Sequence, residues 1–155
     1  LEIAIDESGA RVSVAALPTV AADPVQMRQL LQNLLGNALK FRRPGVVPEV
    51  TVAARVSDGI AELTVEDNGM GFEHQYATRI FRAFERLNGA TAYPGTGIGL
   101  ALCRKIVERH NGTITADGEL GKGAVFTIRL PVEQPATDAT AALPEPLREA
   151  SHALL

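Results

Sequence analysis

The chain has little cysteine, no long uninterrupted apolar run and little net charge, and each of these excludes a class of protein. Cys103 is its single cysteine, so no internal disulfide can form, which is compatible with a reducing compartment. The longest apolar stretch, residues 12–22, is interrupted by Pro18 and falls short of the roughly 20 residues that span a bilayer. Excess charge is also scarce: a net charge of −3 gives no electrostatic reason to expect nucleic acid or an anionic membrane as a partner.

What is present is an ordinary globular composition. The chain has 155 residues, of which 46% are hydrophobic and 21% charged, which suits one domain with a buried core. After Pro131 the composition shifts to alanine, proline and threonine. We therefore expect one domain over residues 1–131 and a linker or poorly ordered tail over residues 132–155. Because the chain opens with Leu1 and not an initiator methionine, we expect a piece of a longer protein.

Apolar periodicity and turn residues predict alternating groups of strands and helices. Strands are expected at residues 1–6, 11–16, 49–57, 60–66, 113–116 and 124–130, and helices at residues 24–41, 73–84, 97–110 and 147–155. Hairpin turns are expected to join three pairs of these strands, the first with the second, the third with the fourth and the fifth with the sixth, and Asp58-Gly59 is the strongest of these turn signals. The predicted fold class is an α/β two-layer sandwich, with a mixed, largely antiparallel sheet covered by helices on one face.

The ends of two helices carry clear signals. Asp23 is the expected N-cap of the first long helix, with Pro24 at the first helical position and Gln26 reaching back from the third. His110 precedes Asn111-Gly112 at the end of a later helix, where a cation is a favourable partner of the helix dipole.

Two glycine-rich segments are the most informative feature of the chain. Asp67-Asn68-Gly69-Met70-Gly71 follows an apolar strand, and Gly95-Thr96-Gly97-Ile98-Gly99-Leu100 opens a helix. Glycines let the backbone approach a ligand, and a helix N-terminus attracts phosphate. The Asp67 carboxylate accepts hydrogen bonds but cannot donate them, so it selects the amino group of adenine over the carbonyl of guanine. Together the segments predict a nucleotide pocket.

A dinucleotide-binding fingerprint is the rival interpretation of the second segment. That fingerprint needs the spacing GxGxxG directly after a strand. The chain reads GxGxG after the turn-rich stretch Leu87–Thr96, so neither the spacing nor the context fits.

A third segment, residues 33–41, places polar side chains beside the apolar stripe of a helix. Asn37 offers the neutral oxygen that a Mg²⁺ ion with phosphate ligands accepts. Asn33 lies one turn earlier and Lys40 three residues later, so the three side chains can line one wall of a triphosphate site. The alternative is that both asparagines are surface or structural groups. Next to buried leucines, however, a carboxamide needs a partner.

In this order the three segments resemble the N, G1 and G2 boxes of the ATP-binding domain of sensor histidine kinases. Those kinases share a superfamily of Bergerat-type ATP sites with DNA gyrase, MutL and gyrase-like chaperones. The resemblance covers roughly residues 18–131. Residues 80–86 are similar to the family's F box, and Gly121-Lys122-Gly123-Ala124 is similar to its last glycine turn, although Ala124 stands where Ser or Thr is more usual.

The resemblance implies ATP and Mg²⁺ as cofactors and assigns a role to each site residue. The catalytic residues are expected to be Asn33, Asn37 and Lys40, with Asn37 as the metal ligand. The nucleotide-binding residues are expected to be Phe41, Asp67, Gly69, Gly71, Arg86, Gly95, Thr96, Gly97, Ile98, Gly99 and Leu100. Residues 87–96 are expected to form a mobile ATP lid, with Phe81 and Phe84 as packing anchors at its base.

Position 33 separates the subfamilies. ATP-hydrolysing relatives usually carry a Glu there to activate water, whereas Asn33 cannot act as a base. The resemblance therefore implies a cytoplasmic protein-histidine kinase domain. Its partner would be a separate dimerisation domain that carries the phosphoacceptor His, and a response regulator would follow indirectly, with no nucleic acid and no membrane contact. Two alternatives stay open: a non-catalytic nucleotide-binding signalling module, and a gyrase-like ATPase or anti-sigma-type Ser kinase.

Overall fold

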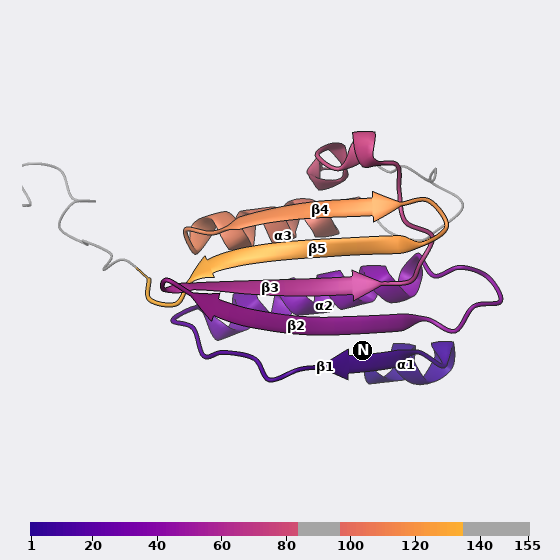
Figure 1. The fold of residues 1–155 in the computed structure, drawn as a ribbon, viewed down its shortest axis with the longest axis horizontal. Coiled ribbons are helices and arrows are strands. Elements are labelled where there is room, and N and C mark those ends of the chain that lie inside the picture. Colours follow the sequence, from indigo (N-terminus) through magenta and orange to yellow (C-terminus); the bar gives the residue numbers. More distant parts are fainter. Residues whose placement is uncertain (84–96, 135–155) are drawn as a thin grey trace, which may run out of the picture.

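The protein is a two-layer sandwich of one mixed sheet and two long helices. The structure, a computed structural model, describes residues 1–83 and 97–134. The sheet has five strands in the order β1-β2-β3-β5-β4, and helices α2 and α3 both lie behind it in the view of Figure 1. The strands are β1 (Arg11–Val14), β2 (Glu49–Ser57), β3 (Ile60–Asp67), β4 (Thr113–Glu119) and β5 (Gly123–Pro131). The long helices are α2 (Pro24–Lys40) and α3 (Gly99–Arg109). The predicted fold class is confirmed.

The N-terminal hairpin prediction is wrong. Glu2–Ser8 is the helix α1, closed by Gly9 in the left-handed conformation at φ 66°, which is a common helix ending. The next strand, β1, does lie at a sheet edge as expected, but it pairs in parallel with β2. Parallel neighbours need a crossover, and α2 supplies it. The unit β1-α2-β2 is therefore a βαβ crossover.

The helix predicted over residues 73–84 is also wrong. The described part of this segment contains two short 3₁₀ turns, His74–Tyr76 (η1) and Arg79–Phe81 (η2). Tertiary packing fixes their placement, because Phe81 is buried and meets the ring of Phe126 edge to face at 6.2 Å. Phe81 is thus a buried packing residue, whereas Phe84 and the lid that both were expected to anchor lie outside the described residues.

The core lies between the sheet and the two helices. Leu30 and Leu34 of α2, Ile106 and Val107 of α3, and Ile128 of β5 are all at most 1% exposed. Buried residues recur three or four positions apart on the helices, at Leu30, Leu34 and Ala38 of α2 and from Cys103 to Ile106 and Val107 of α3, and they alternate at Phe126, Ile128 and Leu130 of β5, which is the periodicity that the sequence predicted. Burying large aliphatic side chains stabilises the fold by roughly 1.5–3 kcal/mol each.

The start of α2 follows the predicted cap. The Asp23 carboxylate accepts hydrogen bonds from the backbone N–H of Val25 at 2.9 Å and of Gln26 at 3.1 Å. The Gln26 side chain reaches back as expected, to the other Asp23 carboxylate oxygen at 3.5 Å. The Asp23 backbone N–H is left for a different partner.

That partner is His110, which joins the end of α3 to the start of α2. Its Nδ1 lies 2.7 Å from the carbonyl oxygen of Ile106, and its Nε2 accepts from the N–H of Asp23 at 3.1 Å. A carbonyl can only accept and an amide N–H can only donate, so the ring is neutral with its proton on Nδ1. In this arrangement His110 acts as a hydrogen-bonding link between the two helix ends.

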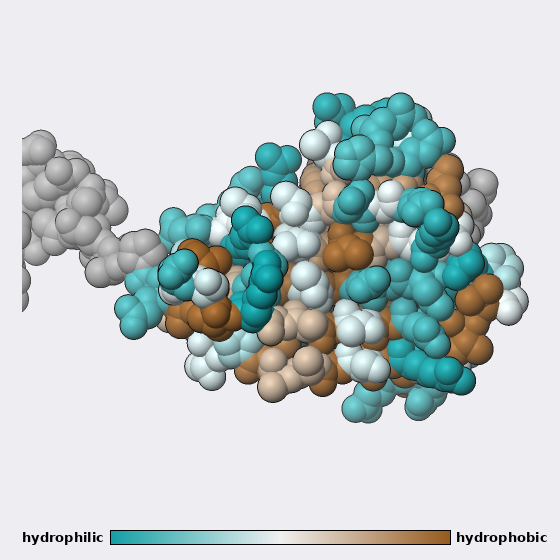
Figure 2. Space-filling view, in the orientation of Figure 1, coloured by the Kyte–Doolittle hydropathy of each residue, from teal (hydrophilic) through white to brown (hydrophobic). Residues whose placement is uncertain are grey.

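The face of the sheet away from the helices mixes hydrophilic and hydrophobic residues and is not covered by a second layer, as Figure 2 shows. Glu62 of β3 binds Arg55 of β2 at 2.8 Å and Arg129 of β5 at 2.9 Å. The hydrogen bond from Arg129 holds the pKa of Glu62 below its ordinary value, with Arg55 adding to the effect. A shallow hollow beside these three side chains contains none of the predicted site residues.

The chain remains bonded to the domain slightly past β5. Val132 donates to Gly59 at 2.8 Å, and the Gln134 side chain donates to the carbonyl of His110 at 2.8 Å. Residues 135–155, with the predicted tail and its short helix, lie outside the described residues. Within the described parts, no helix is long and apolar enough to cross a bilayer.

Replacing His110 tests the link between the two helices. His110→Phe keeps a buried ring but leaves the Asp23 N–H without its acceptor, which should lower the free energy of unfolding by about 1–3 kcal/mol. Urea unfolding followed by circular dichroism measures the change. The control is His74→Phe, whose ring is 81% exposed and whose change should stay within about 0.5 kcal/mol. Equal effects of the two substitutions would contradict the assigned role of His110.

Candidate functional site

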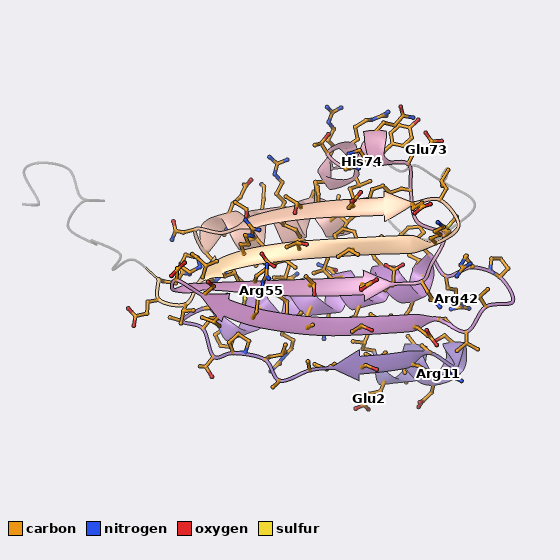
Figure 3. The ribbon with its side chains drawn as sticks, in the orientation of Figure 1. Glu2, Arg11, Arg42, Arg55, Glu73 and His74 are labelled. Carbon is orange, nitrogen blue, oxygen red and sulfur yellow. The ribbon has the colours of Figure 1, made fainter. Side chains whose placement is uncertain are left out.

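Three segments that are distant in the sequence meet at one end of the sheet. The end of β3, the end of α2 and the turn between β4 and β5 all lie on the same side in Figure 1. Figure 3 places Arg42, two residues past α2, at this end. The structure therefore brings the G1 segment together with the end of the N-box helix, as the resemblance requires.

Asp67 is the half-buried carboxylate at the end of β3. Burial raises its pKa above the ordinary 3.8, and the nearby Glu66 acts in the same direction, whereas hydrogen bonds from the backbone of Gly69 and Ala124 lower it. The Gly69 N–H lies 2.8 Å from Oδ1. A carboxylate has about four acceptor sites, so the fixed group retains capacity for one more donor.

The two G1 glycines are required by close packing. A Cβ on Gly69 would lie 2.6 Å from the carbonyl oxygen of Phe41. A Cβ on Gly71 would collide with the backbone of Glu119, and Gly71 also has a positive φ of 64°. No other residue fits at either position without moving the backbone. The glycines thus let the Asp67 loop lie directly against its two neighbours.

The N box and the G2 box meet where α2 packs against α3. A Cβ on Gly99, the first residue of α3, would lie 3.8 Å from Oδ1 of Asn33. The Nδ2 of Asn33 is buried and has no oxygen or nitrogen acceptor, since its neighbour is the weakly accepting Sγ of Cys103. An unpaired buried donor costs about 1–3 kcal/mol, and a phosphate oxygen is an acceptor that would satisfy it. The observed chemistry fits a nucleotide phosphate at the start of α3.

Cys103 lies behind Asn33 in the same contact. Burial raises the pKa of its thiol to about 12, opposed in part by the Asn33 side chain. The thiol is 0% exposed and its Sγ lies 3.9 Å from the carbonyl oxygen of Leu30. Cys103 is therefore a neutral packing residue rather than a nucleophile.

The remaining N-box residues follow along α2. Asn37 is half-buried one turn after Asn33, and its carbonyl accepts from the N–H of Phe41 at 3.0 Å. Phe41 caps α2 and is half-buried, with the Lys40 ammonium 4.9 Å from the centre of its ring. One helix thus carries Asn33, Asn37 and Lys40 from the α3 contact to the Asp67 loop.

The described part of the G2 segment begins at Gly97, which has a positive φ of 76°. Ile98 is the N-cap of α3 and 41% exposed, and Leu100 packs partly against the core. The helix begins two residues later than the prediction of Gly97. The predicted site residues Arg86, Gly95 and Thr96 and the expected lid at residues 87–96 lie outside the described residues.

Sequence reasoning missed how the Asp67 loop is held. Asn68 and Arg43 bond this loop to the connection between α2 and β2, and Gly121 of the β4–β5 turn donates to Met70 at 2.8 Å. Asn68 stood inside the G1 box, but its partners are side-chain and backbone groups far away in sequence. Of these contacts, only the one made by Gly121 had a sign in the sequence, because Gly121 belongs to the segment that resembles the family's last glycine turn.

The comparisons agree with this geometry. Residues 22–134 match the family described as histidine kinase-, DNA gyrase B- and HSP90-like ATPase. Cyanobacterial phytochrome A of Nostoc sp. is 43% identical over 128 residues, which are 83% of this chain and 17% of that protein. The adaptive-response sensory kinase SasA of Synechococcus elongatus is 38% identical over 75% of this chain and 30% of its own length. The chain therefore spans less than a third of these relatives.

Solved structures of histidine kinases are also similar to this chain. The mycobacterial sensor histidine kinase MprB has a TM-score of 0.74 at 28% identity, covering 86% of this chain and 91% of that one. Full-length ShkA in complex with AMPPNP has a TM-score of 0.73 at 33% identity, covering 90% of this chain and 29% of that one. The chain belongs to the histidine kinase-, DNA gyrase B- and HSP90-like ATPase family, and within it resembles sensor histidine kinases such as MprB and SasA.

Proposed function

We propose that this domain binds ATP with Mg²⁺ and presents the γ-phosphoryl group to a histidine on a separate dimerisation domain. The observation that carries the proposal is the pair of groups at the two ends of the site. The half-buried Asp67 carboxylate suits an adenine amino group, and the buried Nδ2 of Asn33, which has no oxygen or nitrogen acceptor, suits a phosphate oxygen. ShkA, a structural relative of this chain, was solved with AMPPNP, which supports a ligand of this class.

Asn37 would hold the metal ion, with the triphosphate supplying further oxygens. Mg²⁺ keeps several waters and needs few protein ligands, so one carboxamide on the wall of the site is sufficient. When bound, the ion neutralises charge on the transferring phosphoryl group. Lys40, one turn from Asn37, would add a positive charge to the same wall.

Asn33 favours transfer to a partner over hydrolysis. A carboxamide cannot take a proton from water, so no base stands where the ATP-hydrolysing relatives usually carry Glu. This residue argues against a gyrase-like ATPase or an anti-sigma-type Ser kinase. Positioning of the γ-phosphoryl group then supplies most of the catalysis.

The partners follow from the reaction. A dimerisation domain of the parent protein would supply the acceptor histidine, and a response regulator would later receive the phosphoryl group. The neutral, doubly hydrogen-bonded ring of His110 is buried, which makes it unsuitable as an acceptor. We place the domain in the cytoplasm, where ATP is available.

Phosphotransfer tests the proposed reaction directly. Incubation with γ-labelled ATP and Mg²⁺ should leave the isolated chain unlabelled and release little phosphate. Adding the dimerisation domain of the parent protein should label that domain on histidine, giving an acid-labile product. Acid-stable label on this chain, or rapid phosphate release, would mean that the reaction class is different.

Asp67→Asn tests adenine recognition. Losing a hydrogen bond to a buried charged group should cost about 1.5–3 kcal/mol, roughly a tenfold to hundredfold loss of ATP affinity. Calorimetry measures the affinity, and circular dichroism checks that the fold is retained. Glu66→Gln, on the exposed face of the same strand, is the matched control. If Asp67→Asn bound ATP as tightly as the wild-type chain, Asp67 would not be the residue that recognises adenine.

The same substitution should stabilise the protein without nucleotide at neutral pH. Because burial raises the pKa of Asp67 above 3.8, the folded state binds this proton more tightly than the unfolded state does. The resulting stability is fully present below the ordinary pKa and is lost as the pH rises through the folded pKa. Thermal unfolding should therefore give Asp67→Asn the higher Tm at neutral pH, and the difference should shrink in acid. A less stable variant at neutral pH would contradict this account.

Asn37→Ala tests the metal ligand. If Asn37 binds Mg²⁺, the substitution should weaken ATP binding about tenfold with Mg²⁺ and much less in chelator. Gln32→Ala, at an exposed position of the same helix, should change neither value. Equal losses of affinity with and without Mg²⁺ would reassign Asn37 to direct nucleotide contact or to packing.

A further inference from the structure

Asn68 directs all of its polar groups to one neighbouring segment. Its Oδ1 accepts from the N–H of Glu49 at 2.8 Å, and its Nδ2 donates to the carbonyl of Val47 at 3.0 Å. Its backbone N–H donates to the carbonyl of Glu49 at 3.2 Å, and its carbonyl accepts from Nε of Arg43 at 2.9 Å. The partners are Arg43 and Val47 of the connection that leads from α2 to β2, and Glu49, the first residue of β2.

A fifth hydrogen bond continues this contact into the helix end. The N–H of Met70 donates to the carbonyl of Phe41, the C-cap of α2, at 2.9 Å. Gly69 lies between Asn68 and Met70 and has no room for a side chain against Phe41. The Asp67 loop and the exit of α2 are thus held together along their length.

We infer that Asn68 is a positioning residue that sets the spacing between the adenine end and the phosphate end of the site. Asp67 precedes Asn68 directly, and α2 carries Asn33, Asn37 and Lys40 up to the segment that Asn68 binds. A nucleotide that spans both ends needs the correct spacing between Asp67 and α2. This inference rests on the proposed ATP binding, and it adds a residue that does not itself touch the nucleotide.

The connection from α2 to β2 has few other ties to the end of β3. Among the described residues, its further backbone bonds run from Val46 to Arg43 within the segment and from Arg11 of β1 to Pro48. Gly45 in the middle has a positive φ of 75° and open space around it. Beyond the β2–β3 ladder, in which Val50 pairs with Asp67, the two side-chain bonds of Asn68 are therefore a large share of what fixes this segment against Asp67.

The test compares two ligands on one variant. Asn68→Ala removes both side-chain hydrogen bonds without adding charge. Adenosine reports on the adenine end alone, whereas ATP with Mg²⁺ must reach both ends. We expect ATP with Mg²⁺ to bind about tenfold more weakly and adenosine to lose less than about twofold, as measured by NMR titration.

The control removes a comparable bond elsewhere. Asn111→Ala loses the hydrogen bond from Asn111 to Gln134, which is 3.1 Å long, and also precedes a glycine. It should lower the Tm without changing the ratio of the two affinities. Arg43→Lys keeps the positive charge but loses the guanidinium Nε, and should change the ratio in the direction of Asn68→Ala, by a smaller factor.

The outcomes separate this inference from the proposed function. Equal losses for adenosine and ATP, or no loss for either ligand, would make Asn68 a purely structural residue and overturn the inference. A wild-type chain that bound no ATP would instead contradict the proposed function. If Asn68→Ala does not fold, an unchanged affinity ratio in Arg43→Lys overturns the inference.

Discussion

The burial of one carboxylate, Asp67, constrains the whole site. Removing a charge from water is costly, so two backbone N–H groups and close-packed glycines must hold it. Those glycines let the Asp67 loop lie against the exit of α2 on one side and the β4–β5 turn on the other. The position of the carboxylate therefore fixes where the N-box helix and the last strand hairpin must lie. A donor from a ligand would offset part of the remaining cost.

The two long helices link the position of Asp67 to the end of the site where we propose that phosphate binds, beside Asn33 and Gly99. α2 and α3 share the core, and their contact contains both Gly99 and the buried amide of Asn33. At the far end, His110 ties the close of α3 to the cap of α2. The helices are thus fixed relative to one another at both ends, which keeps the groups that we propose bind phosphate at a fixed distance from Asp67.

The central part of the fold could be predicted from the sequence, because its signals agree with one another. The cap at Asp23, the turn at Asp58-Gly59 and the apolar stripe of α2 all predicted the structure that forms. The N-terminal segment could not, since a short apolar run fits either a helix or a strand. Its deciding signal, Gly9 as a helix C-cap, resembled a hairpin turn. Asn68 and His110 act through partners distant in sequence, which no local pattern reveals.

The central claim is that the desolvation cost of the charged Asp67 carboxylate, which two backbone N–H groups offset in part, is offset further when a ligand donates a hydrogen bond to it. Carbon-detected NMR of the Asp67 carboxyl group over a pH series, with and without ATP, tests this directly. Without nucleotide the pKa should lie above 3.8, and ATP should lower it, because a hydrogen bond to the charged form favours ionisation. An ordinary pKa without nucleotide, or a raised pKa that ATP leaves unchanged, would contradict the account.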